Sequence, residues 1–184
     1  MNDLPRLAGL IQEKNTIDRE IAVLIGRPAN LGHVGEYIAA AVFGIALEDS
    51  AAHKGSDGRF VEGPLAGRTV NIKWYTQHGG LLDMTPEALP DFYLVLTGPK
   101  SSPISSRGAV HPWVIESVFL FDASELLTAL RARGVKTGIA TSVAGKLWIA
   151  AEIYPVQRNQ GLLLSDEQRR LLDLFRAVEP EHSH

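Results

Sequence analysis

The run Thr69–Tyr75 alternates apolar and polar side chains, a pattern typical of a β-strand with two unlike faces. One face carries Val70, Ile72 and Trp74, and the other carries Asn71, Lys73 and Tyr75. A lysine beside an amide in mid-strand is unusual, because the reverse face of this strand is wholly apolar. Lys73 is therefore expected to extend its charge to water, to pair with an acid or to take part in chemistry.

The first candidate partner of Lys73 is Glu36, which lies in the helical run 31–47. Apolar residues at helical spacing predict a core stripe along this run: Leu31, Val34, Ile38, Ala41, Val42 and Ile45. The opposite side of the helix is also apolar, except for Glu36. A helix that is apolar nearly all round is predicted to be buried, so this carboxylate needs a cation or strong hydrogen-bond donors, or it stays protonated.

The second candidate partner is Asp57, which lies between Gly55 and Gly58. A turn over 63–67 follows, and the Lys73 strand comes after it. This order predicts a β-hairpin with Asp57 on its first arm and Lys73 on its second.

The succession of a helix glutamate, a strand aspartate and a lysine on the next strand resembles the PD-(D/E)xK nuclease superfamily, which has the restriction-endonuclease-like fold. Glu36, Asp57 and Lys73 match these three positions, and Asn71 stands where the family usually carries Asp or Glu. The resemblance covers roughly residues 31–98. The whole chain also resembles a bacterial domain with asparagine in place of the motif acid.

The resemblance implies a metal-dependent nuclease that hydrolyses phosphodiester bonds in DNA. Asp57 and Glu36 would bind Mg²⁺ or Mn²⁺, and the Asn71 side-chain oxygen and the Ile72 carbonyl would be further ligands. Lys73 would orient the attacking water or stabilise developing negative charge. Such a metal polarises the phosphate and lowers the pKa of its bound water, and Mg²⁺ prefers oxygen ligands.

Each assignment has a structural alternative. Glu36 and Lys73 can form a buried salt bridge, Asp57 with Gly58 is a common turn pair, and the Asn71 amide can bond a neighbouring loop. Two other functions stay open with these alternatives. One is a catalytically inactive module of the same fold that binds nucleic acid or a protein partner. The other is an interaction protein that docks through its first helix.

Composition and charge bound the class of protein. The 184 residues, 45% hydrophobic and 21% charged, predict one globular domain over 1–178 with a frayed tail over 179–184. The formal net charge of −3 argues against strong non-specific DNA binding. Two acid-free stretches are nevertheless expected to contact phosphates, through Lys100, Arg107, Arg131, Arg133 and Lys136. The alternatives are a surface loop and a solvated helix end.

Several classes of site and location are not expected. Cysteine is absent, so the chain has neither a disulfide nor a thiolate metal site. The histidines nearest the candidate site, His33, His53 and His78, show no zinc spacing and are expected at the surface or at helix caps. No run reaches the length of a membrane span, and no signal peptide is visible. A cytoplasmic protein is expected, with a homodimer as one possible state.

The remaining segments predict an α/β fold, with α+β as the alternative, built on a central mixed sheet flanked by helices. Helices are predicted over 5–25, from Ser124 to about Arg133, and from the Ser165 and Gln168 capping box to about Val178. The run 147–154 is predicted to form a strand or a short helix, with the helix favoured. Strands are predicted over 92–97 and 113–121, the first of them central.

Overall fold

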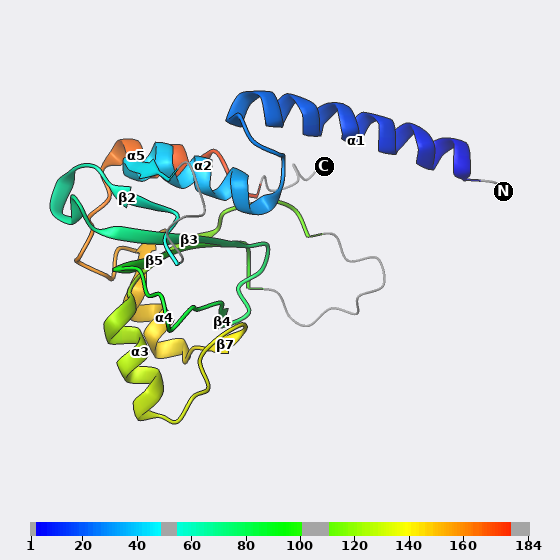
Figure 1. Cartoon of the computed structure of the whole chain (residues 1–184). Coiled ribbons are helices and arrows are strands. Elements are labelled where there is room, and N and C mark those ends of the chain that lie inside the picture. Colours follow the sequence, from blue (N-terminus) through cyan, green and yellow to red (C-terminus); the bar gives the residue numbers. More distant parts are fainter. Residues whose placement is uncertain (1–2, 49–54, 101–110, 178–184) are drawn as a thin grey trace, which may run out of the picture.

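Six strands form one mixed sheet in the computed structural model, which describes residues 3–48, 55–100 and 111–177 (Figure 1). The strands in spatial order are β1 (Ile45–Leu47), β2 (Gly58–Phe60), β3 (Thr69–Tyr75), β5 (Phe92–Thr97), β6 (Ser117–Asp122) and β8 (Glu152–Tyr154). Strands β3 and β5 are parallel, and all other neighbours are antiparallel. The expected α/β class with a mixed sheet is confirmed, and β5 is central as predicted.

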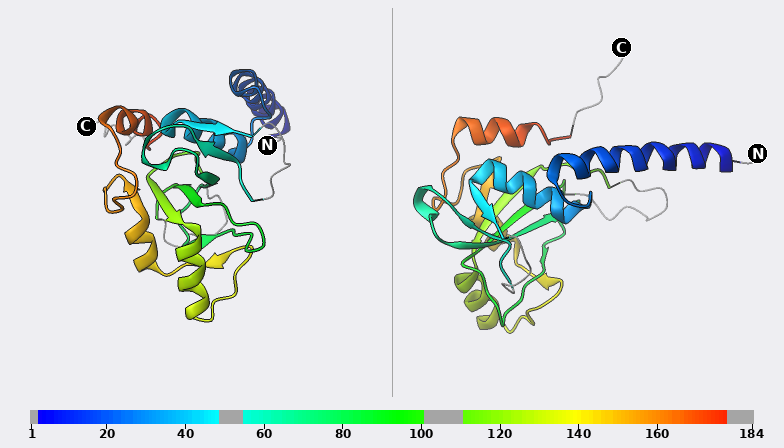
Figure 2. Two further views of the ribbon diagram at one scale, coloured as in Figure 1. Left: turned by 60° about the vertical axis from the view of Figure 1, so that its left-hand side comes forward. Right: turned by 45° about the horizontal axis from the view of Figure 1, so that its top comes forward.

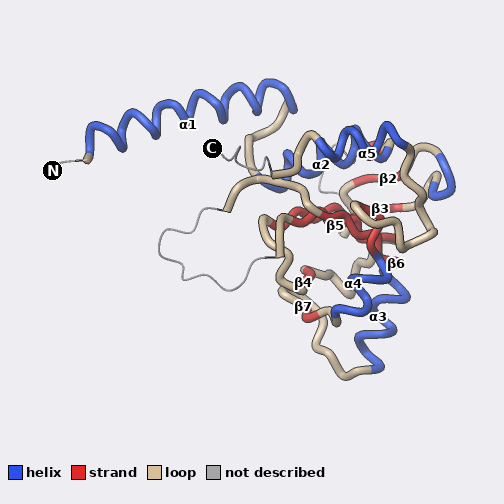
Figure 3. Tube along the Cα trace, turned by 180° about the vertical axis from the view of Figure 1, so that it is seen from behind, coloured by secondary structure: helices blue, strands red, loops and turns tan. Residues whose placement is uncertain are grey.

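Two layers cover the faces of this sheet (Figure 3). Helices α2 (Leu31–Phe43) and α5 (Asp166–Asp173) pack on one face. Helices α3 (Ala123–Ala132) and α4 (Gly145–Ala151) pack on the other, beside a small sheet of β4 (Leu81–Leu82) and β7 (Thr141–Ser142). The predicted alternation along β3 is confirmed. Val70, Ile72 and Trp74 belong to the α2 core, and Tyr75 packs against the other core.

A glycine sets the distance between α2 and β3. A Cβ atom added to Gly35 would lie 3.0 Å from the Cβ of Trp74, so a larger residue would push the helix off the strand. Asn30 caps the start of α2 by accepting a hydrogen bond from the His33 N–H at 2.9 Å. Glu36, the next residue after Gly35, is thereby held close to the sheet. The helix is not buried all round as predicted, because Tyr37 is 41% exposed and Ala41 is also exposed.

Helix α1 (Leu4–Ile25) projects from the body of the molecule (Figures 1 and 2). It matches the predicted helix over 5–25 and ends, as expected, at Gly26, whose φ of 69° suits glycine. None of its residues is buried. No helix in the described ranges is long and apolar enough to cross a membrane.

Strand β6 begins at Ser117, four residues later than the predicted start at Trp113. The preceding residues instead contact the end of the chain beyond α5. The Ile115 N–H donates to the Phe175 carbonyl at 2.8 Å, and the Glu116 carboxylate accepts from the Ala177 N–H at 3.0 Å. Glu116 also pairs with Arg176 at 3.3 Å, which accounts for an acid at this position.

Four helix predictions differ in their bounds. The predicted helical run 31–47 is a helix only to Phe43, and Ile45–Leu47 form β1. Asp122, not Ser124, caps α3, because its carboxylate accepts from the Glu125 N–H at 2.9 Å. The run 147–154, predicted as a short helix with a strand as the alternative, contains the end of α4 and the whole of β8. The capping box of Ser165 and Gln168 is confirmed, but α5 ends at Asp173. The predicted tail over 179–184 lies outside the described residues.

Candidate functional site

Asp57 lies immediately before β2, on the first arm of the predicted hairpin. Its backbone N–H donates to the Val70 carbonyl at 2.9 Å, and its own carbonyl accepts from the Glu48 N–H at 3.0 Å. Its carboxylate accepts from the Ile72 N–H at 2.6 Å. The backbone of Asp57 therefore continues the sheet between β1 and β3, while its side chain binds the edge of β3.

Strand β2 leaves β3 at this point. Their pairing is limited to Gly58 with Val70 and Arg59 with Thr69. On the amino-terminal side of Asp57 the chain turns away from β3. There Gly55 lies so close to Ala88 that a Cβ atom added to this glycine would be 1.8 Å from the Ala88 carbonyl oxygen. A strand residue directs its N–H and its carbonyl to the same neighbour, so the Ile72 carbonyl lies on the edge that Asp57 flanks.

Glu36 pairs with Arg27, a residue of the connection between α1 and α2. The side chains of Glu36 and Arg27 are 19% and 41% exposed. The salt bridge between Glu36 and Lys73 that the sequence left open is not formed. Arg27 replaces Lys73 as the partner because Gly26 ends α1 and the chain turns back over the start of α2.

Three charged side chains lie around the Asp57 carboxylate: Glu36, Lys73 and Arg27. Burial raises the pKa of Asp57 above its ordinary value of 3.8, and the negative charge of Glu36 raises it further. The Ile72 N–H, Lys73 and Arg27 act against this and favour the ionised form. Asp57 and Glu36 are thus close enough to repel each other, with Lys73 and Arg27 as the neighbouring cations.

Lys73 is half-buried and forms no ion pair or hydrogen bond with any residue in the described ranges. Its charge nevertheless acts on Asp57. The lysine is therefore held beside the carboxylate without being used by a structural salt bridge, which leaves its ammonium group available for another partner.

Asn71 is buried, with only 7% of its surface exposed, and its side-chain oxygen has no hydrogen-bond partner among the described residues. It lies on β3 directly after Val70, whose carbonyl binds Asp57. A buried amide oxygen without a donor is costly, so a partner such as a cation or water is expected. The alternative in which Asn71 bonds a neighbouring loop through this oxygen is not observed within the described part of the chain.

These groups fit a small divalent cation. Asp57 and Glu36 offer carboxylate oxygens, and Asn71 and Ile72 offer neutral ones, which is the oxygen chemistry that Mg²⁺ and Mn²⁺ prefer. No group of three His, Cys, Asp or Glu residues within the described ranges is arranged to hold a metal ion. A cation here would therefore depend on two acids and on neutral oxygens.

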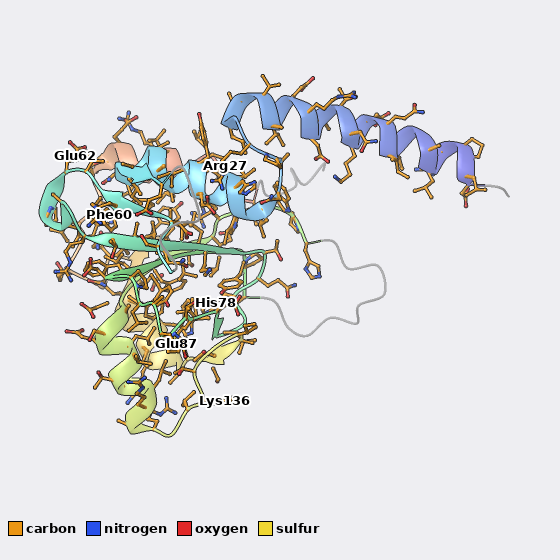
Figure 4. The ribbon with its side chains drawn as sticks, viewed as in Figure 1. Arg27, Phe60, Glu62, His78, Glu87 and Lys136 are labelled. Atoms are coloured by element: carbon orange, nitrogen blue, oxygen red, sulfur yellow. The ribbon has the colours of Figure 1, made fainter. Side chains whose placement is uncertain are left out.

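The residues predicted to contact nucleic acid do not gather at this place. Arg131 lies in the last turn of α3, and Arg133 and Lys136 follow it, all three exposed. Figure 4 shows Lys136 beyond α3, at the opposite end of the molecule from Arg27. Lys100 is exposed after β5, and Arg107 lies outside the described residues.

Three further residues were missed or misjudged from the sequence. Arg27, which stands between the two helix terminators Gly26 and Pro28, was not predicted as a site residue. Burial raises the pKa of the Tyr93 phenol on β5, and the nearby Asp57 carboxylate raises it further. His78 is not at the surface but half-buried, stacked on Phe119 with ring centroids 5.2 Å apart.

No protein-family model matches the chain, and no curated protein matches it.

Proposed function

We propose that the protein is a metal-dependent nuclease that hydrolyses phosphodiester bonds in DNA at the site around Asp57. The observation that carries this proposal is the meeting of Asp57 with Glu36 and Lys73 at the edge where β2 leaves β3. The unpartnered oxygen of Asn71 supports it. The succession α2, β1, β2, β3 also agrees with the order of motif positions in the PD-(D/E)xK superfamily.

A bound Mg²⁺ or Mn²⁺ would polarise the phosphate and lower the pKa of its bound water. Asp57 and Glu36 would bind the cation, and Asn71 and the Ile72 carbonyl would add neutral oxygens. The Ile72 N–H fixes the orientation of the Asp57 carboxylate at 2.6 Å. Lys73, which has no structural ion pair within the described ranges, would stabilise the negative charge that develops on the phosphate oxygens.

Cleavage of plasmid and single-stranded DNA tests the proposal directly. The wild-type protein should cleave with Mg²⁺ or Mn²⁺ and not with EDTA. Asp57→Ala and Lys73→Ala should each lower the rate at least about a hundredfold, as loss of one charge-stabilising group does in other enzymes. Lys14→Ala, at a 70% exposed residue of α1 outside the candidate site, is the matched control and should cleave normally. No metal-dependent cleavage by a folded wild-type protein would overturn the proposal.

One observation favours a second function, that of a catalytically inactive module of the same fold that binds nucleic acid or a protein partner. Arg27 already neutralises Glu36, so the cluster has two acids and two cations without a metal. In that case the charges serve the structure alone.

Arg27→Gln separates the two functions. If the site binds a metal, removing a competing cation frees Glu36 and should tighten Mn²⁺ binding several-fold. If the cluster is only structural, the change leaves two neighbouring acids less compensated and should lower the melting temperature without creating metal affinity. Arg19→Gln, on the exposed surface of α1, is the control and should change neither quantity.

A further inference from the structure

A pocket of about 460 Å³ lies at the end of β3, next to the candidate nuclease site. Its wall begins at Trp74, the residue after Lys73, and continues through Tyr75 to Gln77. Leu31, in the first turn of the helix that carries Glu36, and Leu81 of β4 also line it. The pocket is therefore built from the same strand and the same helix as the carboxylate site.

The lining is suited to a flat aromatic group with polar edges. The half-buried Tyr75 supplies a ring surface, and Leu31 and Leu81 supply apolar walls. The exposed Gln77 supplies an amide whose nitrogen lies 2.9 Å from the His111 Nδ1. The Tyr75 hydroxyl accepts from the Asp83 N–H at 2.9 Å, and burial raises the pKa of this phenol. The tyrosine is thus neutral and fixed in position, as a stacking surface requires.

The negative charge of Asp83 determines which part of a nucleotide the pocket can bind. It lines the pocket, and its carboxylate accepts from the Ala140 N–H at 2.7 Å while keeping further lone pairs for other donors. A carboxylate repels a phosphate but accepts hydrogen bonds from the N–H groups of a base edge. The phosphate would accordingly remain near Lys73 and Arg27, and the base would turn toward Tyr75.

We infer that this pocket binds one unpaired nucleobase, next to the phosphate at the Asp57 site, so that the substrate is single-stranded nucleic acid. A base inside a duplex is stacked and paired, and it reaches a side pocket only if it leaves the stack. An unpaired base enters without that cost. The inference rests on the proposed function for the position of the phosphate, but the pocket can be tested by binding alone.

Binding of a short fluorescent single-stranded oligodeoxynucleotide, followed by anisotropy in EDTA, tests the pocket without cleavage. Single-stranded DNA should bind more tightly than the same sequence as a duplex. Leu81→Trp, which fills the pocket from a side chain that is 46% exposed, should weaken single-strand binding at least about fivefold, the effect of one lost base stack. Leu163→Trp, at a 61% exposed leucine before α5, is the matched control and should bind as the wild type does.

An abasic scan of the same oligonucleotide gives a second readout. Removing the base at one position should cost as much affinity as Leu81→Trp, and the two losses should not add. If Leu81→Trp does not fold, Gln77→Ala, at an exposed residue, replaces it with the same expected direction. Equal affinity for duplex and single strand, or unchanged binding by the folded pocket variants, would overturn the inference.

The two proposals fail in different ways. Pocket-dependent binding of single strands without any metal-dependent cleavage would remove the nuclease and keep the base pocket. Metal-dependent cleavage that Leu81→Trp and the abasic positions leave unchanged would keep the nuclease and remove the base pocket.

Discussion

The ionised form of Asp57 lowers the stability of the folded protein. Burial and Glu36 raise its pKa, so the folded protein binds a proton at this carboxyl more readily than the unfolded chain does. The folded state is therefore favoured below the ordinary pKa of 3.8, and that advantage is lost as the pH rises through the folded pKa. At neutral pH an ionised Asp57 is a destabilising group, as expected for a residue kept for function rather than for packing.

Asp57→Asn should consequently stabilise the protein while removing its activity. The amide oxygen can still accept from the Ile72 N–H, and the repulsion with Glu36 disappears. A gain of about 1 kcal/mol corresponds to roughly 2–4 °C in melting temperature for a chain of this size. Melting curves at pH 7 and pH 4 check this, with a larger gain expected at pH 7. A lower melting temperature for the variant at pH 7 would show that the carboxylate is a net stabilising group.

Asn71 offers a test of ligation at a single atom. Asn71→Asp is nearly isosteric and adds a negative charge beside Asp57. If the Asn71 oxygen binds the cation, the variant should bind Mg²⁺ more tightly and keep or raise the cleavage rate. Without metal it should melt at a lower temperature than the wild type, because a third acid then lies in a buried place. Lower stability with no gain in Mg²⁺ affinity would place Asn71 outside the metal shell.

The half-buried position of His78 predicts that the unfolding free energy falls in mild acid. Burial and the charge of Lys100 lower its pKa below 6.5, although Glu152 opposes them. The unfolded chain then binds a proton first, so stability is lost as the pH falls below about 6.5. His78→Phe should preserve the ring contacts with Phe119 and Trp148 and should reduce the loss of unfolding free energy between pH 7 and pH 5. Denaturant melts at both pH values measure it, and an identical loss in the variant would contradict the account.

The helices and strands whose form depends on neighbouring residues in the chain could be predicted from local sequence patterns. Helix α1 with its glycine stop, the β3 alternation and the Ser165 capping box follow from spacing and backbone hydrogen bonds within a few residues. Other features depend on segments far apart in the chain. The late start of β6 follows from bonds to residues after α5, which no pattern near Trp113 indicates.

The candidate site also combines features that the local sequence predicts with features that depend on the course of the whole chain. The three candidate positions could be selected from residue type and order, and the structure brings Asp57, Glu36 and Lys73 into one electrostatic cluster. The pairing of Glu36 with Arg27 could not be found, because it depends on how the chain turns after Gly26. The basic residues after α3 share a composition with phosphate-binding segments, but composition carries no information on their distance from Asp57.

The two amino-terminal helices should differ sharply in their contribution to stability. Leu10 and Ile17 of α1 are 53% and 56% exposed, whereas Ile38 of α2 is 5% exposed. Leu10→Ala and Ile17→Ala should each change the unfolding free energy by less than about 0.5 kcal/mol, and Ile38→Ala should cost about 2–5 kcal/mol. Urea melts of the three variants compare them. A large loss for the α1 variants would mean that this helix is covered in solution.

The whole molecule joins two cores across one sheet, and β3 contributes to both. Its apolar face anchors α2 and hence Glu36. Its other face carries Asn71 and Lys73, and its edge is left open where β2 departs. The proposed metal site and the proposed base pocket follow one another along this strand, so a single-stranded substrate would run along β3.

Calorimetric titration of Mn²⁺ into the wild-type protein and into Asp57→Asn tests the central claim most directly. The claim is that Asp57 and Glu36 hold a divalent cation between them. The account predicts one Mn²⁺ bound by the wild type, weaker binding as the pH falls and Asp57 takes up its proton, and no measurable binding by a folded Asp57→Asn variant. Equal Mn²⁺ binding by both proteins, or none by the wild type, would contradict it.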